Sequence, residues 1–173
     1  MTCWPASITD LHADADVLRR WRSGMIDVRA GRLVRVAWRP LPKLVSHLGA
    51  RTVGRWLHGH KSGDVCRLYY HQPRACPEFL VLSYVVSYRD TSFATFRRAV
   101  EVLDEIAAVR GTYAIVCQVT NQNISHRLLS RWGWEQHVQH LFGRNYIKRL
   151  REFGRKAESE ELRAESTELL AIP

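Results

Sequence analysis

The stretch that decides the fold runs from Phe79 to Val119 and reads FLVLSYVVS-YRDTS-FATFRRAVEVLDEIAAV-RG-TYAIVCQV. Its first run is apolar at both odd and even positions, which is typical of a strand covered on both faces of a sheet. After a break at Arg89–Ser92, apolar side chains recur at helical spacing until Arg110-Gly111 ends the pattern. A second apolar run, Tyr113–Val119, again has strand length. The stretch therefore predicts a strand, a long helix and a second strand.

The flanking residues extend this pattern on both sides. Upstream, Val65–Tyr70 reads as a strand. Downstream, Ile124–Trp132 has the spacing of a short amphipathic helix that stops at Gly133. Two alternating runs, Trp134–Leu141 and Asn145–Leu150, then read as strands. This order of elements predicts an α/β fold built on a mixed sheet.

The first 62 residues are harder to interpret. A helix is predicted over 9–21, because Thr9 is a candidate N-cap and apolar residues follow at helical spacing. The alternation over 32–38 predicts a strand. Pro42 is placed to open a further helix that extends to about Leu57.

Length and charge set the broad class of the protein. The 173 residues carry 26 Lys and Arg against 17 Asp and Glu, with a formal net charge of +9. We expect one domain over 1–150, with its core at 65–150, followed by a charged tail over 151–173. Residues 19–74 hold 13 Lys and Arg but only two acids, Asp27 and Asp64. Such a basic segment fits nucleic acid, an anionic membrane or a phosphorylated small molecule.

Membrane, secretion and metal signals are weak in this sequence. No apolar run reaches the ~18 residues of a membrane-spanning helix, and no secretory signal is evident, so a cytoplasmic protein with no membrane contact is expected. The four cysteines have no framework spacing, which favours reduced thiols. Cys66, His71 and Cys76 have part of a zinc-knuckle spacing, but there is no Cys-x2-Cys pair and a strand separates the first two. We therefore predict no metal site.

Two segments of the core carry a resemblance to a known family. The first segment, Arg89–Ala94, reads RDTSFA, where the family has the pattern Gln/Arg-x-x-Gly-x-Gly/Ala. The second covers 122–129 and Gly133-Trp134, where the family has Asn-x-x-Ala-x-x-Leu-Tyr, a helical turn and Gly-Phe. Over about residues 65–150 the chain resembles the Gcn5-related N-acetyltransferase (GNAT) superfamily, through element order and spacing more than identity. The resemblance implies a mostly antiparallel, twisted mixed sheet flanked by helices. It also implies acetyl transfer from acetyl-CoA to an amine acceptor.

The resemblance also implies where acetyl-CoA would bind. The backbone of Tyr84–Val86 would meet the pantetheine arm and the thioester carbonyl. The start of the following helix would hold the pyrophosphate, since free N–H groups and the helix dipole attract anions. Arg97 and Arg98 would reach the ribose phosphate. The cofactor residues implied in this way are Val85, Val86, Arg89, Thr91, Ser92, Phe93, Ala94, Asn121, Gln122 and Asn123.

The candidate catalytic residues depart from the family pattern. Leu129 stands where the family has a Tyr that protonates the leaving thiolate. His126 or Tyr84 would have to supply that proton instead. For the general base, Glu78 at the start of the buried strand is the family-like candidate, and His126 is the alternative.

Two residues of the phosphate turn leave a second function open. Ser92 replaces the first glycine of the family pattern, and Asp90 adds a negative charge where phosphates would lie. The alternative function is a catalytically inactive binding module for nucleic acid or an acidic partner, which would use the basic residues 19–74. Trp38 and Trp56 in that segment could stack on bases or line a substrate pocket, although burial in the core is the default expectation for tryptophan. The sequence also leaves a homodimer open.

Overall fold

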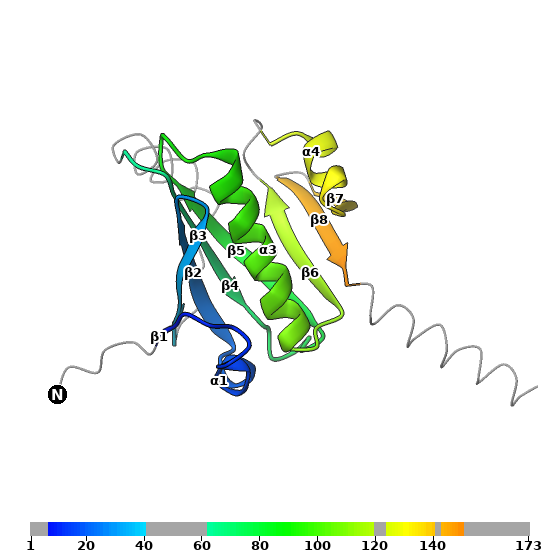
Figure 1. The fold of residues 1–173 in the computed structure, drawn as a ribbon. Coiled ribbons are helices and arrows are strands. Elements are labelled where there is room, and N and C mark those ends of the chain that lie inside the picture. The colour runs from blue at the N-terminus through cyan, green and yellow to red at the C-terminus, as the bar shows by residue number, and fades with distance from the viewer. Residues whose placement is uncertain (1–6, 41–61, 120–123, 141–142, 151–173) are drawn as a thin grey trace, which may run out of the picture.

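The computed structural model describes residues 7–40, 62–119, 124–140 and 143–150, which form one eight-stranded sheet with helices (Figure 1). The strands lie in the order β1-β3-β2-β4-β5-β6-β8-β7. Only β5 and β6 pair in parallel among the described strands, so the sheet is mixed and mostly antiparallel, which confirms the predicted fold class. The elements are β1 (Ser7–Ile8), α1 (Ala15–Arg20), β2 (Ser23–Arg29), β3 (Arg32–Trp38), β4 (Val65–His71), β5 (Phe79–Ser87), α3 (Phe93–Val109), β6 (Ala114–Val119), α4 (His126–Arg131), β7 (Glu135–His140) and β8 (Gly143–Arg149).

Helix α3 covers one face of the sheet and supplies the centre of the core (Figure 1). Its fully buried stripe includes Ala99, Val102, Leu103 and Ile106, and the helix packs mainly against β2, β4 and β3. Full burial of side chains of this size contributes about 1.5–3 kcal/mol each. The helix ends where expected, because Gly111 takes a left-handed backbone with φ of 63°.

Strand β2 is a central strand that the sequence pattern does not reveal. Six of its seven residues are buried, although they include Gly24 and the charged Asp27. Gly24 is required for packing, since a Cβ there would lie 2.6 Å from the Tyr70 hydroxyl oxygen. Asp27 is tolerated because Arg29 donates to its carboxylate at 3.1 Å and the Arg67 guanidinium lies 3.4 Å away. Gly24 and Asp27 thus interrupt the apolar pattern by which this buried strand would be recognised in the sequence.

The helix predicted over 9–21 is wrong in its extent. Strand β1 occupies Ser7–Ile8, and helix α1 begins only at Ala15. Between them the Asp10 carboxylate accepts hydrogen bonds from the backbone N–H groups of His12 and Ala13. These bonds stabilise a turn in place of the first helical turn.

The other predicted elements lie close to their expected bounds. The strand over 32–38 and the strand over 79–87 are confirmed at the predicted residues. The elements that correspond to β4, α3, β6, α4, β7 and β8 are confirmed within three residues at each end. The helix predicted from Pro42 to about Leu57 and the tail over 151–173 lie outside the described residues. In the described part of the chain, no helix has the length and apolar character needed to cross a membrane.

Candidate functional site

Strands β5 and β6 pair along only part of their length and then diverge. The parallel register joins Phe79–Leu82 to Ala114–Cys117. Beyond it, β5 stays paired with β4 as far as Ser87, and β6 stays paired with β8 as far as Val119. The facing backbone edges of 83–87 and 118–119 therefore make no ladder with each other. We call this unpaired region between the two strands the opening.

A bulge in β5 lies at the start of the opening. Tyr69 of β4 pairs with Tyr84, but Tyr70 pairs with Leu82, so Ser83 is the extra residue. Leu82 packs against the core under α3, whereas Tyr84 belongs to a separate cluster on the opposite face. The bulge thus changes which side chains of β5 point away from α3 at the point where the strands diverge.

The other end of the candidate cofactor site is the N-terminus of α3, which the protein caps with its own groups. Ser92 is the N-cap, and its hydroxyl accepts from the Thr95 N–H at 3.1 Å. The Asp64 carboxylate accepts from the Ser92 N–H at 2.8 Å and from the Ser92 hydroxyl at 2.9 Å. The bond from the Ser92 N–H is the main cause that lowers the pKa of Asp64. A carboxylate of the chain therefore lies where the resemblance implies a phosphate.

The rest of the phosphate turn is also held by internal bonds. The Thr91 hydroxyl donates to the Val65 carbonyl at 2.7 Å and accepts from the Tyr88 N–H at 2.8 Å. The Asp90 carboxylate accepts from the Gly63 N–H at 3.1 Å. Within the described residues, the N–H groups of Phe93 and Ala94 make no hydrogen bond. These two N–H groups are therefore the ones at this turn that could donate hydrogen bonds to a bound anion, and the nearby Arg89 is exposed.

The predicted catalytic residues lie in different parts of the sheet. Glu78 is exposed at the paired end of β5, and its carbonyl accepts from the Tyr113 N–H at 2.7 Å. It lies six residues from Tyr84, or about 20 Å along the strand. His126 is the first residue of α4 and stacks on the Tyr146 ring, with centroids 5.9 Å apart. The structure thus keeps Tyr84 with Val85 and Val86 at the opening, and places Glu78 away from it.

Several further candidates are accounted for by internal contacts or lie outside the described residues. Arg97 pairs with Glu101 at 2.9 Å, and Arg98 pairs with Glu105 at 2.7 Å. Asn121, Gln122 and Asn123 lie outside the described residues. Leu129, at the position of the family's Tyr, is buried in the core.

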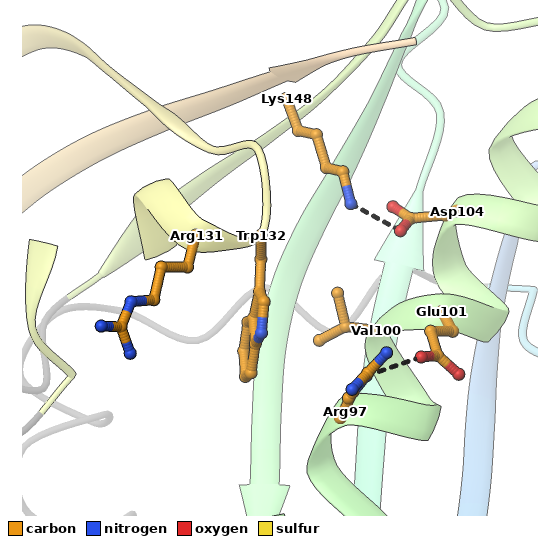
Figure 2. Close-up of a pocket in the computed structure, with 7 residues that line it drawn as sticks. All are labelled: Arg97, Val100, Glu101, Asp104, Arg131, Trp132 and Lys148. Carbon is orange, nitrogen blue, oxygen red and sulfur yellow. Dashed lines mark hydrogen bonds and ion pairs between the residues drawn. The ribbon is translucent and has the colours of Figure 1, made fainter. Parts of the chain in front are cut away.

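A cavity of about 340 Å³ lies between α3, the end of α4 and β8 (Figure 2). Figure 2 shows Lys148 and Asp104 in contact in its lining, with Nζ and Oδ2 2.6 Å apart. Burial raises the pKa of Asp104, and the bond from Lys148 opposes that shift. The cavity is lined by Arg97, Val100, Glu101, Asp104, Arg131, Trp132 and Lys148. Arg97 pairs with Glu101 and Lys148 with Asp104, while the Arg131 side chain has no ion-pair partner among the described residues, so the lining carries three cations against two carboxylates.

The structure separates the residues that had suggested a zinc knuckle. Cys66 is buried in the core under α3, and burial raises the pKa of its thiol to about 12. His71 contacts Ser83 on the opposite face of the sheet, and Cys76 is exposed in the loop after β4. Among the described residues, no three His, Cys, Asp or Glu side chains gather as a metal site would require.

Two features of the site escaped the sequence analysis. Asp64 is one of only two acids in the basic segment, and that rarity is the one signal that could have singled it out. The contact between His71 and Ser83, with Nδ1 and Oγ 2.6 Å apart, joins β4 to the bulge of β5. No spacing rule predicts it, since the bulge decides which face Ser83 takes.

Comparisons with known proteins give distant likenesses among solved structures alone. No family model matches the chain, and no curated protein matches it. Among solved structures, the crystal structure of a nourseothricin acetyltransferase is similar over 83% of this chain and 97% of that one, with 13% identity and a TM-score of 0.42. Identity and TM-score this low carry no functional assignment, which depends on the geometry of the site.

Proposed function

We propose that the protein transfers an acyl group, most simply acetyl, from a coenzyme A thioester to an amine acceptor. The observation that carries this proposal is the opening between β5 and β6, with its bulge at Ser83. Among the described residues the two strands form no ladder with each other there, so an extended amide-containing arm can hydrogen-bond between them in the manner of an added strand. The donor's pantetheine arm has that chemistry.

The backbone of Tyr84–Val86 would hold the reacting end of the donor. An N–H of this segment that donates to the thioester carbonyl oxygen would stabilise the negative charge that develops when the amine attacks. Fixed alignment of amine and carbonyl in the opening would lower the barrier further. The Tyr84 hydroxyl, beside the bulge, would protonate the leaving thiolate, with His126 as the alternative donor.

The two ends of the site differ in how well they fit coenzyme A. The opening suits the pantetheine arm, because β5 and β6 form no ladder with each other over 83–87 and 118–119. The N-terminus of α3 fits the pyrophosphate poorly, because only the Phe93 and Ala94 amides are unbonded and the Asp64 carboxylate repels an anion. We therefore propose that the pantetheine arm supplies most of the donor's affinity and the nucleotide supplies little.

Calorimetric titration with acetyl-CoA and with S-acetylpantetheine tests both parts of this proposal. We expect both ligands to bind, with Kd values within about tenfold of each other, or about 1.4 kcal/mol. Desulfo-CoA serves as the control for the thioester. The absence of binding by either acetylated ligand would contradict the proposed function. Much tighter binding of acetyl-CoA would instead show that the nucleotide end is a working phosphate site.

One observation favours the alternative function as a nucleic-acid-binding module. Arg32 and Arg35 of β3 are exposed, and the Arg39 guanidinium lies 5.5 Å from the centre of the Tyr69 ring. Together they give the β2–β3 edge a basic surface with an aromatic ring beside it. If this surface binds a DNA or RNA duplex, log affinity should fall linearly and steeply with log salt. Replacement of Arg32 and Arg35 by Gln should then flatten that slope.

A further inference from the structure

A histidine and a serine form a hydrogen-bonded pair beside the opening. His71 is the last residue of β4, and its Nδ1 lies 2.6 Å from the Oγ of Ser83. Ser83 is the bulged residue of β5 and follows Leu82, the last residue of β5 that pairs with β6. The pair therefore lies at the inner end of the opening.

The pair lies on the face of the sheet that α3 leaves uncovered. Along β4, Leu68 and Tyr70 face the core under α3, while Tyr69 belongs to the cluster on the opposite face. His71, which is next in this alternation, shares the face of Tyr69. An acceptor that approaches the thioester from the face free of α3 would meet the imidazole of His71.

We propose that His71 is the general base of the acyl transfer and that Ser83 orients its imidazole. This inference rests on the proposed function of the same site. His71 would be a catalytic residue because it would contact the acceptor nitrogen, whereas Ser83 would be a positioning residue.

The reaction requires a base because an alkylamine is mainly an ammonium ion near pH 7 and has no lone pair for attack. When Nδ1 of His71 carries the proton and donates to the Ser83 oxygen, Nε2 keeps a lone pair. Nε2 takes a proton from the ammonium group, and the amine nitrogen forms a bond to the thioester carbonyl carbon. The C–S bond then breaks, and its electron pair leaves on the sulfur. The attacking nitrogen loses its second proton as the amide forms, and the sulfur gains one from the Tyr84 hydroxyl, which the nitrogen's proton replenishes by way of water. His71 finally releases its proton to water.

The surroundings of His71 favour its neutral form. Burial lowers the pKa of His71, and no charged group contributes to that shift. The titratable or charged groups around it include Tyr69 on β4, Tyr84 on β5 and Arg39, which lies over the Tyr69 ring. Arg22, just before β2, donates to the carbonyls of Gln72 and Pro73, which follow His71. Asp27 and Arg67 pair four residues further along β4, and the β2 partner of His71 is the neutral Ser23. A neutral imidazole at pH 7 is what a general base requires.

The test compares two acceptor probes in wild-type protein and in His71→Gln. Ethylamine is mainly protonated at pH 7, whereas 2,2,2-trifluoroethylamine is mainly neutral and needs a base less. With acetyl-CoA as donor, we expect His71→Gln to lower kcat/KM about 100-fold or more for ethylamine and about tenfold or less for the fluorinated amine. His12→Gln, an exposed histidine before α1, is the matched control and should change neither value. The His71→Gln rate with ethylamine should recover as pH rises toward the pKa of the amine.

A second readout needs no acceptor or donor. In ¹⁵N-histidine-labelled protein, the nitrogen shifts of wild type should place the proton on Nδ1, with titration of His71 below its ordinary pKa. Ser83→Ala should shift the tautomer toward Nε2 and lower kcat/KM by roughly tenfold without removing the acidic limb of its pH profile. A proton on Nε2 in wild type would overturn the assigned role of Ser83.

The outcomes separate this inference from the proposed function. If wild-type protein does not bind acetyl-CoA, the proposed function fails and the inference fails with it. If wild type transfers acetyl and His71→Gln loses the same factor for both amines, His71 has only a structural role. If His71→Gln loses no activity, another group is the base.

Discussion

The two ends of the proposed donor site differ in how the protein uses their backbone hydrogen-bonding groups. At the opening, β5 and β6 no longer pair with each other in the described part of the chain. At the N-terminus of α3, the helix N–H groups that could bind an anion are partly taken by Asp64 and by Ser92 itself. The opening thus has no β5–β6 ladder among the described residues, whereas the helix N-terminus is capped by side chains of the protein itself. Binding capacity in this molecule should therefore depend on the opening more than on the helix.

Deletion of Ser83 should have the largest effect, because it removes the bulge that shapes the opening. Without the extra residue, Leu82 and Tyr84 become neighbours on opposite faces, so β5 can pair with β4 in an unbroken register and loses the local bend and twist of the bulge. We expect loss of acetyl-CoA binding, while the free energy of unfolding changes by about 1 kcal/mol or less, because the core side chains of β5 keep their faces.

Ser83→Ala is the matched control for that deletion, because it removes the hydroxyl and keeps the residue count of β5. Denaturant unfolding and calorimetry on the two variants separate the bulge from the side chain. Retained binding in the deletion variant would show that the opening does not depend on the bulge.

The alkylation rates of Cys76 and Cys117 should differ by about 100-fold or more, and the rate at Cys117 reports where the opening ends. Cys117 lies in the last row in which β6 pairs with β5, and burial raises the pKa of its thiol to about 12. Because the thiolate is the nucleophile, only about one molecule in 10⁴ carries it there at pH 8. Exposed Cys76 should react with iodoacetamide first, and Cys117 should react faster as pH rises.

Peptide mass spectrometry over time distinguishes these cysteines, and buried Cys66 is the control, since its thiol pKa is also raised to about 12. Rapid alkylation of Cys117 at pH 8 would mean that the opening extends past the last paired row. The pairing would then be a poor guide to where a ligand can reach.

Asp64→Asn removes the carboxylate charge at the N-terminus of α3 and should therefore improve nucleotide binding at that end alone. The amide side chain can still accept from Ser92, but it carries no negative charge. We expect roughly fivefold tighter acetyl-CoA binding and no change for S-acetylpantetheine, since only the former has a pyrophosphate. Asp16→Asn, at the exposed ion pair with Arg19 on α1, is the control for net charge. Equal gains for both ligands would mean that Asp64 does not act on phosphate.

The same contrast explains which parts could be predicted from the sequence. The stretch 79–119 was predictable because burial imposes period-2 and helical patterns directly on neighbouring residues. Strand β2 was not predictable from its own residues. The Tyr70 side chain leaves no room for a Cβ at Gly24, and two arginines pair with the buried Asp27, and these contacts form only in the folded chain. Periodicity describes how a segment meets the core and carries little information about single polar contacts between segments.

The site follows the same rule. The turn before α3 was located correctly, but its partner Asp64 is 28 residues away from Ser92. The bulge that places Ser83 against His71 depends on the register between β4 and β5, which one strand's sequence does not determine. Local patterns thus located the elements that carry the site, while long-range contacts decided what each end can bind.

The smallest expected effect concerns a hydroxyl at the same row of the sheet as the inner end of the opening. Tyr146 of β8 pairs with Cys117, and its buried hydroxyl has no hydrogen-bond partner among the described residues. Because an unpaired buried hydroxyl costs free energy, Tyr146→Phe should leave the free energy of unfolding unchanged or raise it by up to about 1 kcal/mol. Thr112→Val should lower it by a similar amount, since the Thr112 hydroxyl donates to the Ala107 carbonyl. If Tyr146→Phe gains stability and loses acetyl transfer, the hydroxyl is held unpaired for a ligand, and the opening reaches through the sheet toward α3.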